Sequence, residues 1–196
     1  MRSTLDKLIS GAGLLLAVVL LIAGGLLTWA HVFIDNQVHD QLAMQHITMP
    51  AKADLETQAQ HDALDKYAGQ QLTTGPQAKA FADHYILVHM NAASGGKTYE
   101  QVSGEYIGLS DAAKASPDGV ALGQLRQTLF MGDTLRGLLL YGYAFATMGT
   151  IALYAAIASF GGAILFLALS MLGIRHSRRA VATVPAEWDR GVPVGV

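Results

Sequence analysis

The chain has 196 residues, of which 52% are hydrophobic and only 14% are charged, and its mean hydropathy is +0.33. A soluble domain of this length usually carries more charge, so part of the chain is expected to be buried in something other than its own core. The net charge of -2 gives no basic surface for nucleic acid, and the lack of cysteine excludes disulfides, thiolate metal sites and cysteine nucleophiles.

The first apolar stretch follows a short N-terminal segment, residues 1–7, and covers residues 8–34. It carries no charged side chain unless His31 is protonated. Because it exceeds the roughly 20 residues needed to cross about 30 Å of hydrocarbon, it predicts a transmembrane helix. A cleaved signal peptide, with Thr28-Trp29-Ala30 at the cleavage site, is the alternative, but its apolar region would be unusually long.

The polar region between the apolar stretches, residues 35–136, carries 19 of the 28 charged side chains, with seven basic and twelve acidic residues. Apolar residues at every fourth position predict that the first helix continues to Gln45. The run Ile47-Thr48-Met49-Pro50 should end it, because a residue before proline is pushed toward extended geometry. A more polar helix is predicted from Ala53 to Tyr67.

The clearest amphipathic pattern begins at Gly75-Pro76, where proline suits the first turn of a helix. Gly95-Gly96 is predicted to end this helix, and Thr98 with Gln101 forms a capping box for a short helix through Tyr106. Ser116-Pro117-Asp118-Gly119 predicts a turn, after which a leucine stripe leads toward the second apolar stretch. The face predicted to be buried consists of Ala78, Phe81, Ala82, Tyr85, Ile86, His89 and Ala92.

The second apolar stretch covers residues 137–174 and contains no acid or base other than tyrosine and no histidine. Its 38 residues would make a helix of roughly 57 Å at 1.5 Å per residue. Two crossings would need about 40 residues and a turn. One long helix is therefore predicted, with residues 147–171 in the hydrocarbon and its first turns outside.

Basic residues beside the two spans indicate their direction, since positive charge favours the cytoplasmic side. Arg2 and Lys7 precede the first span, and Arg175, Arg178 and Arg179 follow the second. Both termini are therefore expected in the cytoplasm of a bacterium, with residues 35–136 forming an extracytoplasmic, mainly helical domain. Residues 175–196 are predicted to be a basic, disordered tail. The fold class expected is an all-α plasma-membrane protein with two spans.

Small residues recur along both spans, and such residues let membrane helices approach closely. The bilayer and another integral membrane protein, or a second copy of the chain, are the partners they predict. The alternative is that the two spans pair with each other. The predicted helix-packing residues are Gly13, Ala17, Gly24, Gly25, Gly142, Ala146, Gly149, Ala156 and Gly162.

Candidate chemistry is sparse. His39, His46, His84 and His89, with nearby methionines, could offer ligands to soft copper or zinc ions, but no pair has the spacing typical of a metal site. The string from Asn91 to Thr98 resembles a phosphate-binding loop, yet asparagine stands where that motif requires glycine. No nucleotide, cofactor or catalytic residue is therefore predicted.

A family resemblance rests on three groups of residues. They are Gly75-Pro76 followed by His89, the string Gly95-Gly96-Lys97-Thr98-Tyr99, and Leu125-Arg126 with Leu129-Phe130. With these, the chain resembles the two-span actinobacterial membrane proteins often labelled aromatic ring-opening dioxygenase of the LigA type. A ring-opening dioxygenase needs iron held by histidines and a carboxylate, and the sequence shows no such spacing. The resemblance implies an envelope protein rather than that enzyme.

These observations lead to an expected function without catalysis. The chain is predicted to be an accessory or scaffolding protein that packs against a larger membrane complex, such as a respiratory supercomplex. The alternative is an extracytoplasmic sensor that binds a ligand or metal through its histidine and methionine residues.

Overall fold

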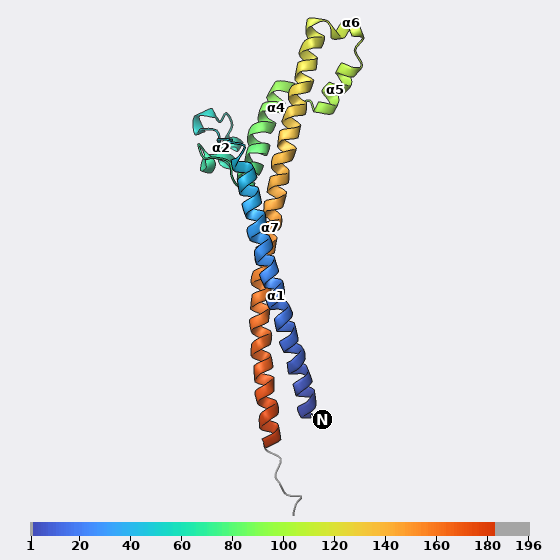
Figure 1. Ribbon diagram of the computed structural model, residues 1–196. Coiled ribbons are helices and arrows are strands. Elements are labelled where there is room, and N and C mark those ends of the chain that lie inside the picture. The colour runs from blue at the N-terminus through green and yellow to red at the C-terminus, as the bar shows by residue number, and fades with distance from the viewer. Residues whose placement is uncertain (1, 183–196) are drawn as a thin grey trace, which may run out of the picture. The chain divides into compact units, whose positions relative to one another are not determined.

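The computed structural model describes the backbone of residues 2–182 and the side chains of residues 5–176 and 178 (Figure 1). Within this part of the chain the regular structure is helical, apart from one antiparallel bridge between Thr48 and Gln71, which confirms the all-α prediction. The elements in order are α1 (Arg2–Ala43), η1 (Lys52–Asp54), α2 (Gln58–Leu64), η2 (Asp65–Tyr67), α3 (Gly75–Phe81), η3 (Ala82–Ile86), α4 (Leu87–Ser94), α5 (Tyr99–Ile107), α6 (Asp111–Lys114) and α7 (Pro117–Ala182).

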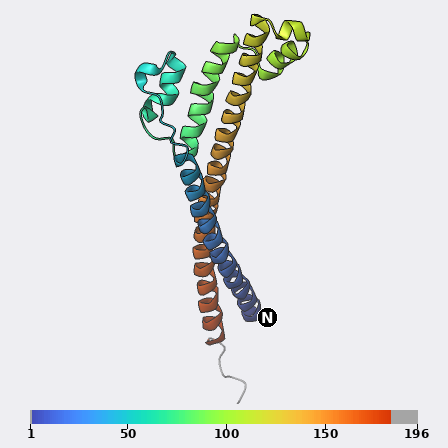
Figure 2. The ribbon, with the colours of Figure 1, turned by 45° about the horizontal axis from the view of Figure 1, so that its top comes forward.

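The chain divides into two compact units, and α1 and α7 each contribute to both. Unit 1 consists of Met1–Ala30 and Ala152–Val196, of which residues 2–30 and 152–182 are described. Unit 2 consists of His31–Ile151 and contains all the short helices (Figure 2).

Unit 1 is made of the first part of α1 and the last part of α7. These two helices are long and apolar enough to cross a membrane. Of the most apolar 18 residues of each helix, only 17% in α1 and 11% in α7 are buried within the protein, so most of their apolar side chains face outward. Two helices of span length are therefore present, as predicted.

Helix α7 extends beyond the predicted 137–174 at both ends. The predicted turn at Ser116–Gly119 is instead a helix start, with Pro117 in the first turn and the Ser116 hydroxyl accepting a hydrogen bond from the Gly119 amide at 3.2 Å. At the other end, residues 175–182 are helical rather than part of a disordered tail. No proline interrupts the sequence between Pro117 and Pro185. The rest of the predicted tail, residues 183–196, lies outside the described residues.

Between α1 and α3, unit 2 closes a loop with paired backbone. The Met49 amide donates to the Gln70 carbonyl, and the Leu72 amide donates to the Ile47 carbonyl, both at 2.8 Å. The predicted break of the first helix near Pro50 is thus confirmed, although α1 itself ends at Ala43. The prediction of one helix from Ala53 to Tyr67 is wrong, because Leu55 to Thr57 leave the helical path between η1 and α2. That detour buries Leu55 and makes Thr57 the N-cap of α2.

Two apolar clusters form the core of unit 2. The larger collects side chains from α1, the closed loop, α3, η3 and α7, namely Leu42, Met49, Leu55, Leu64, Leu72, Ala78, Phe81, Ala82 and Leu139. The smaller contains Met90, Val102 and Leu129, with Leu122 and Leu125 packed against it. The predicted leucine stripe of α7 therefore does face a core.

The helical segment from Gly75 to Ser94 is not uniform. Its start at Gly75-Pro76 and its end at Gly95-Gly96 are confirmed, and both closing glycines have positive φ. Between them, η3 is a π-helical turn, which inserts one residue relative to a regular α-helix. The insertion turns the later positions, so Met90 and Ser94 are buried while the predicted His89 and Ala92 are exposed.

Candidate functional site

In unit 1, the predicted small residues bring α1 and α7 together. Gly13 lies against Ser170, Gly24 against Phe160, and Gly162 against Leu20. Ala17 and Ala156 are almost fully buried. As the residue number rises along α1, that of its neighbour on α7 falls, so the helices are antiparallel. Gly25 has open space around the position of a Cβ atom.

In unit 2, the remaining small residues also have neighbours within the unit. Gly142 lies near Leu42, Gly149 against Ile34, and Ala146 against Gly75. Glycine at 149 leaves its carbonyl accessible to Nδ1 of His31, 3.0 Å away. The small-residue positions other than Gly25 are therefore used inside the chain, and a further partner needs a different surface.

Such a surface is present in unit 2 as a groove of about 550 Å³ between residues 33–47 of α1 and the following turn, and residues 135–148 of α7. One wall is apolar and comes from α7, where Leu138, Tyr141, Phe145 and Met148 are each more than half exposed. The other wall includes Gln37, Gln41 and Gln45, whose side-chain amides form no hydrogen bond with the residues whose side chains are described. No acidic or basic side chain is among its lining residues.

The antiparallel register within unit 2 places this groove beside Asp35 and Asp40, the first charged residues of α1 after its apolar stretch. Gly149 packs on Ile34 and Gly142 lies near Leu42, so the intervening turns of α7 run beside Asp35 and Asp40. The exposed apolar face of α7 therefore lies at the level where charged residues resume on α1, at Asp35 and Asp40. A large exposed apolar face at that level is typical of a surface that contacts another molecule.

Sequence reasoning missed this groove, although signals for both walls exist. Leu138, Tyr141, Phe145 and Met148 are three or four residues apart and thus share one face of a helix. Gln37 and Gln41 on α1, and Gln45 in the turn that follows it, recur at every fourth residue. What the sequence could not supply is the register of the two helices, which determines that these faces meet.

The histidines proposed as metal ligands lie on separate elements. Nδ1 of His39 is 3.2 Å from Asp40, and Nδ1 of His89 is 2.8 Å from the Tyr85 carbonyl, with the two rings in contact. His46 occupies a left-handed turn after α1, and His84 is half-buried in η3. Among the described residues, no three histidine or acidic side chains come close enough to hold a metal ion.

The string resembling a phosphate-binding loop is the end of one helix and the start of the next. Gly95 and Gly96 end α4, and Thr98 begins α5 by accepting a hydrogen bond from the Gln101 amide, as predicted. Lys97 donates to both carboxylate oxygens of Glu105, at 2.8 and 2.9 Å.

A charged cluster joins α3, η3 and α7 in unit 2. Asp83 accepts hydrogen bonds from Lys79 at 2.5 Å and from Arg136 at 3.2 Å, and Arg136 also donates to the Ala82 carbonyl at 3.0 Å. Burial by itself would raise the pKa of Asp83, but the hydrogen bonds and positive charges of Lys79 and Arg136 together hold it below its ordinary value of 3.8. The hydrogen bond and charge of Asp83 in turn raise the pKa of Lys79. Arg136 thus ties η3 to α7.

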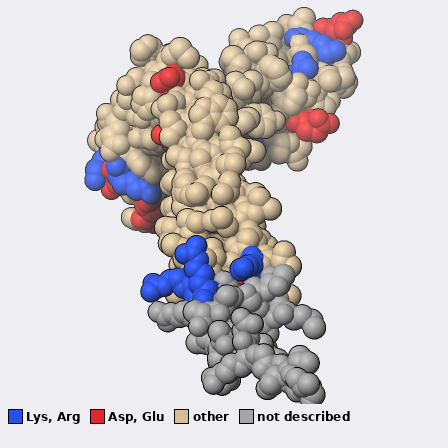
Figure 3. All heavy atoms as spheres, turned by 60° about the horizontal axis from the view of Figure 1, so that its bottom comes forward, with Lys and Arg blue, Asp and Glu red and all other residues tan. Residues whose placement is uncertain are grey.

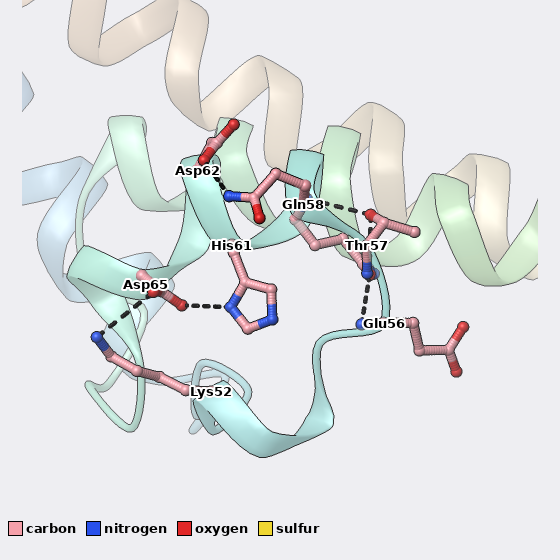
Figure 4. A network of polar contacts seen from close by, with 8 residues as sticks. Lys52, Glu56, Thr57, Gln58, His61, Asp62 and Asp65 are labelled. Carbon is pink, nitrogen blue, oxygen red and sulfur yellow. Dashed lines mark hydrogen bonds and ion pairs between the residues drawn. The ribbon is translucent and has the colours of Figure 1, made fainter.

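A second polar network surrounds the start of α2 (Figure 4). His61 and Lys52 point toward Asp65 from either side, with Nδ1 of His61 at 2.9 Å and Nζ of Lys52 at 3.5 Å. The hydrogen bond with His61 is the largest cause that lowers the pKa of Asp65. All three side chains are at least one-third exposed, and their contacts tie η1, α2 and η2 together.

Comparison of the chain with known proteins identified no related protein. Neither a family model, nor a curated protein, nor a solved structure matches the chain. The resemblance to two-span actinobacterial proteins therefore stays a prediction.

Proposed function

We propose that this chain is a non-enzymatic accessory or scaffolding subunit of the cell envelope, which crosses the bacterial plasma membrane twice and holds a helix of a larger membrane complex in the groove of unit 2. Both termini lie in the cytoplasm and residues 35–136 lie outside the membrane. The observation that supports this proposal most strongly is the groove, which has an exposed apolar wall beside the turns of α1 that contain Asp35 and Asp40.

A helix is the occupant that the groove fits best. Its two walls are antiparallel helices, and a third helix can lie along such a groove and place residues three and four apart against the apolar wall. Gln37 and Gln41 are about 6 Å apart along α1 and Gln45 follows in the next turn of the chain, so all three could bond polar groups of that helix. The apolar wall continues toward the spans, so a partner helix could reach it from the bilayer.

The absence of cysteine allows a scan with single cysteines carrying a photoactivated cross-linker in native membranes. Probes at 138, 141, 145 and 148 should cross-link to one membrane protein, while probes at the exposed neighbours Ala144 and Thr147, which do not line the groove, should not. This helical periodicity is the expected result. Equal labelling at all positions, or an adduct with twice the mass of the chain, would contradict a heterologous partner.

Topology is tested separately with a cysteine replacing Lys97 in unit 2. A maleimide that cannot cross membranes should label it in intact spheroplasts. Labelling only after lysis would place unit 2 in the cytoplasm and overturn the proposed orientation. The cross-linking result does not depend on that orientation.

A further inference from the structure

Unit 1 contains a cleft of about 590 Å³ between residues 6–16 of α1 and residues 166–176 of α7. Its size is within the range of small-molecule sites. Most of its exposed lining is apolar, but polar groups occur along it. The residues that carry the argument are Asp6, Ser10 and Gly13 on α1, and Ser170, Gly173 and His176 on α7.

Serine and glycine alternate across this cleft. The hydroxyl of Ser170 occupies the space beside Gly13, and the hydroxyl of Ser10 occupies the space beside Gly173. Ser170 is 3% exposed, and its hydroxyl has no hydrogen-bond partner among the described residues. Ser159, on the same helix, instead donates to the Ala155 carbonyl at 2.8 Å. A buried hydroxyl without a partner is costly, so an acceptor on a bound molecule would stabilise it.

The apolar lining of the cleft is continuous with the outer surface of the spans. Ile9, Leu169 and Leu172 line it, and each is more than half exposed. A molecule in the cleft can therefore extend along the same surface that faces lipid. This favours a ligand with a hydrocarbon chain over a free ion.

Basic side chains gather at this end of unit 1 (Figure 3). Lys7 lies one turn before Ser10, and Arg175 lies one turn after Leu172, with Arg178 in the next turn. No ion pair is recorded for these three residues within the described part of the chain. These three residues do not line the cleft, but Lys7 and Arg175 each lie one turn from a residue that does. Basic groups beside a cleft between membrane helices favour an anionic lipid headgroup. Asp6, which also lines the cleft, can accept a hydrogen bond from a headgroup hydroxyl.

We infer that this cleft binds an anionic glycerophospholipid of the leaflet on that side, with its phosphate near Lys7 and Arg175, its ester region at Ser170 and one acyl chain along Leu169 and Leu172. A glycerol headgroup fits best, because its hydroxyls can reach Asp6. The inference rests on the membrane placement of unit 1 in the proposed function and is independent of the groove in unit 2.

The test is native mass spectrometry of the full chain released from vesicles that contain equal amounts of phosphatidylglycerol and phosphatidylcholine with identical acyl chains. One phosphatidylglycerol should be retained. Lys7→Gln and Arg175→Gln should each lower its retention about fivefold, as for a basic group near an anionic membrane surface. Ser170→Ala should weaken retention, while Ser159→Ala should not. Added inorganic phosphate should not displace the lipid.

A tryptophan that fills the cleft separates this site from general attraction to the membrane. Ala12 lines the cleft, and Leu15 on the same helix does not. Ala12→Trp should abolish retention and Leu15→Trp should preserve it. Equal retention of the two lipids, or charge variants that weaken binding while Ala12→Trp has no effect, would overturn the inference. If carbonate washing instead removed the protein from membranes, the span assignment would fail, and this outcome is distinct from lost lipid selectivity.

Discussion

The same two helices, α1 and α7, serve two units that bury different kinds of side chain. In unit 1 their contact uses glycine, alanine and serine, and large apolar side chains such as Leu15 point outward. Unit 2 instead buries large apolar side chains in its core, where Leu64 and Leu72 are fully buried, although the groove wall of α7 stays exposed. Unit 2 therefore has a core of large apolar side chains, while unit 1 has the pattern expected of helices surrounded by lipid.

The units also differ in how their polar groups are satisfied. Unit 2 uses three capping boxes of one pattern, Thr57 with Gln60, Thr74 with Gln77, and Thr98 with Gln101. Each begins a short helix that would be marginal alone. The described part of unit 1 has no such cap and needs none between residues 5 and 30, because the backbone of a continuous helix bonds itself.

Truncation of a core leucine should show the largest difference between the units. Leu64→Ala should destabilise unit 2 by about 2–5 kcal/mol, because it leaves a cavity in the larger cluster. Leu15→Ala, at a position 67% exposed, should change unfolding far less. Thermal unfolding in mild detergent, followed by circular dichroism and by protease resistance of unit 2, measures both. Equal losses would mean that the exposed leucines of unit 1 are buried in a core.

The second-largest expected effect is a loss of stability in unit 1 when a glycine between its two helices is replaced by a bulkier residue. Gly13→Val would force its side chain against the Ser170 hydroxyl, and such overpacking costs about 1–3 kcal/mol. Gly25→Val, at a position with open space, is the matched control. Helix separation during titration with a denaturing detergent reports the effect. Adding Ser170→Ala should restore part of the lost stability, and strict additivity of the two changes would argue against this contact.

Acid should weaken unit 2 through Asp83. Its pKa is lower in the folded chain than its ordinary 3.8, so its contribution is present above that pH and is lost as the pH falls through the folded pKa. Asp83→Asn should lower stability at pH 7 by on the order of 1 kcal/mol and flatten its fall below pH 4. The midpoint of unfolding between pH 6 and pH 2 is the measurement. Glu100→Gln, at an exposed position, should leave the slope unchanged.

The smallest effect should come from the exposed ion pair that follows α4. Lys97→Gln removes its contact with Glu105, and both side chains are about half exposed. Exposed pairs contribute about 0–1 kcal/mol and are screened by salt. The change in unfolding should therefore be small at low salt and vanish at 0.5 M salt. A large loss would reveal that this pair supports the joint between α4 and α5.

Local signals in the sequence predicted the helix boundaries well where one residue type determines the backbone. Gly75-Pro76, Gly95-Gly96 and Thr98 with Gln101 all mark boundaries that the structure contains. The capping boxes at Thr57 and Thr74 carried the same signal and were overlooked. Recognising the first of them would have prevented the prediction of an unbroken helix from Ala53 to Tyr67.

Features that depend on distant residues could not be predicted in this way. The π-helical turn of η3 has no marker in its own sequence, and Arg136 is more than fifty positions from the Ala82 carbonyl that it bonds. The buried face consequently shifts from His89 to Met90. Likewise, small residues indicate close approach of helices, but they do not say which helix is approached. Both the groove of unit 2 and the cleft of unit 1 depend on which helices pair.

The first and last turns of unit 2 lie side by side, joined by His31 and the Gly149 carbonyl. Both ends are helical backbone running in opposite directions. Residues 31–151 could therefore be grafted onto the ends of the two helices of a water-soluble antiparallel coiled coil, which would replace unit 1. Such a chimera would present the groove to candidate partner peptides without detergent.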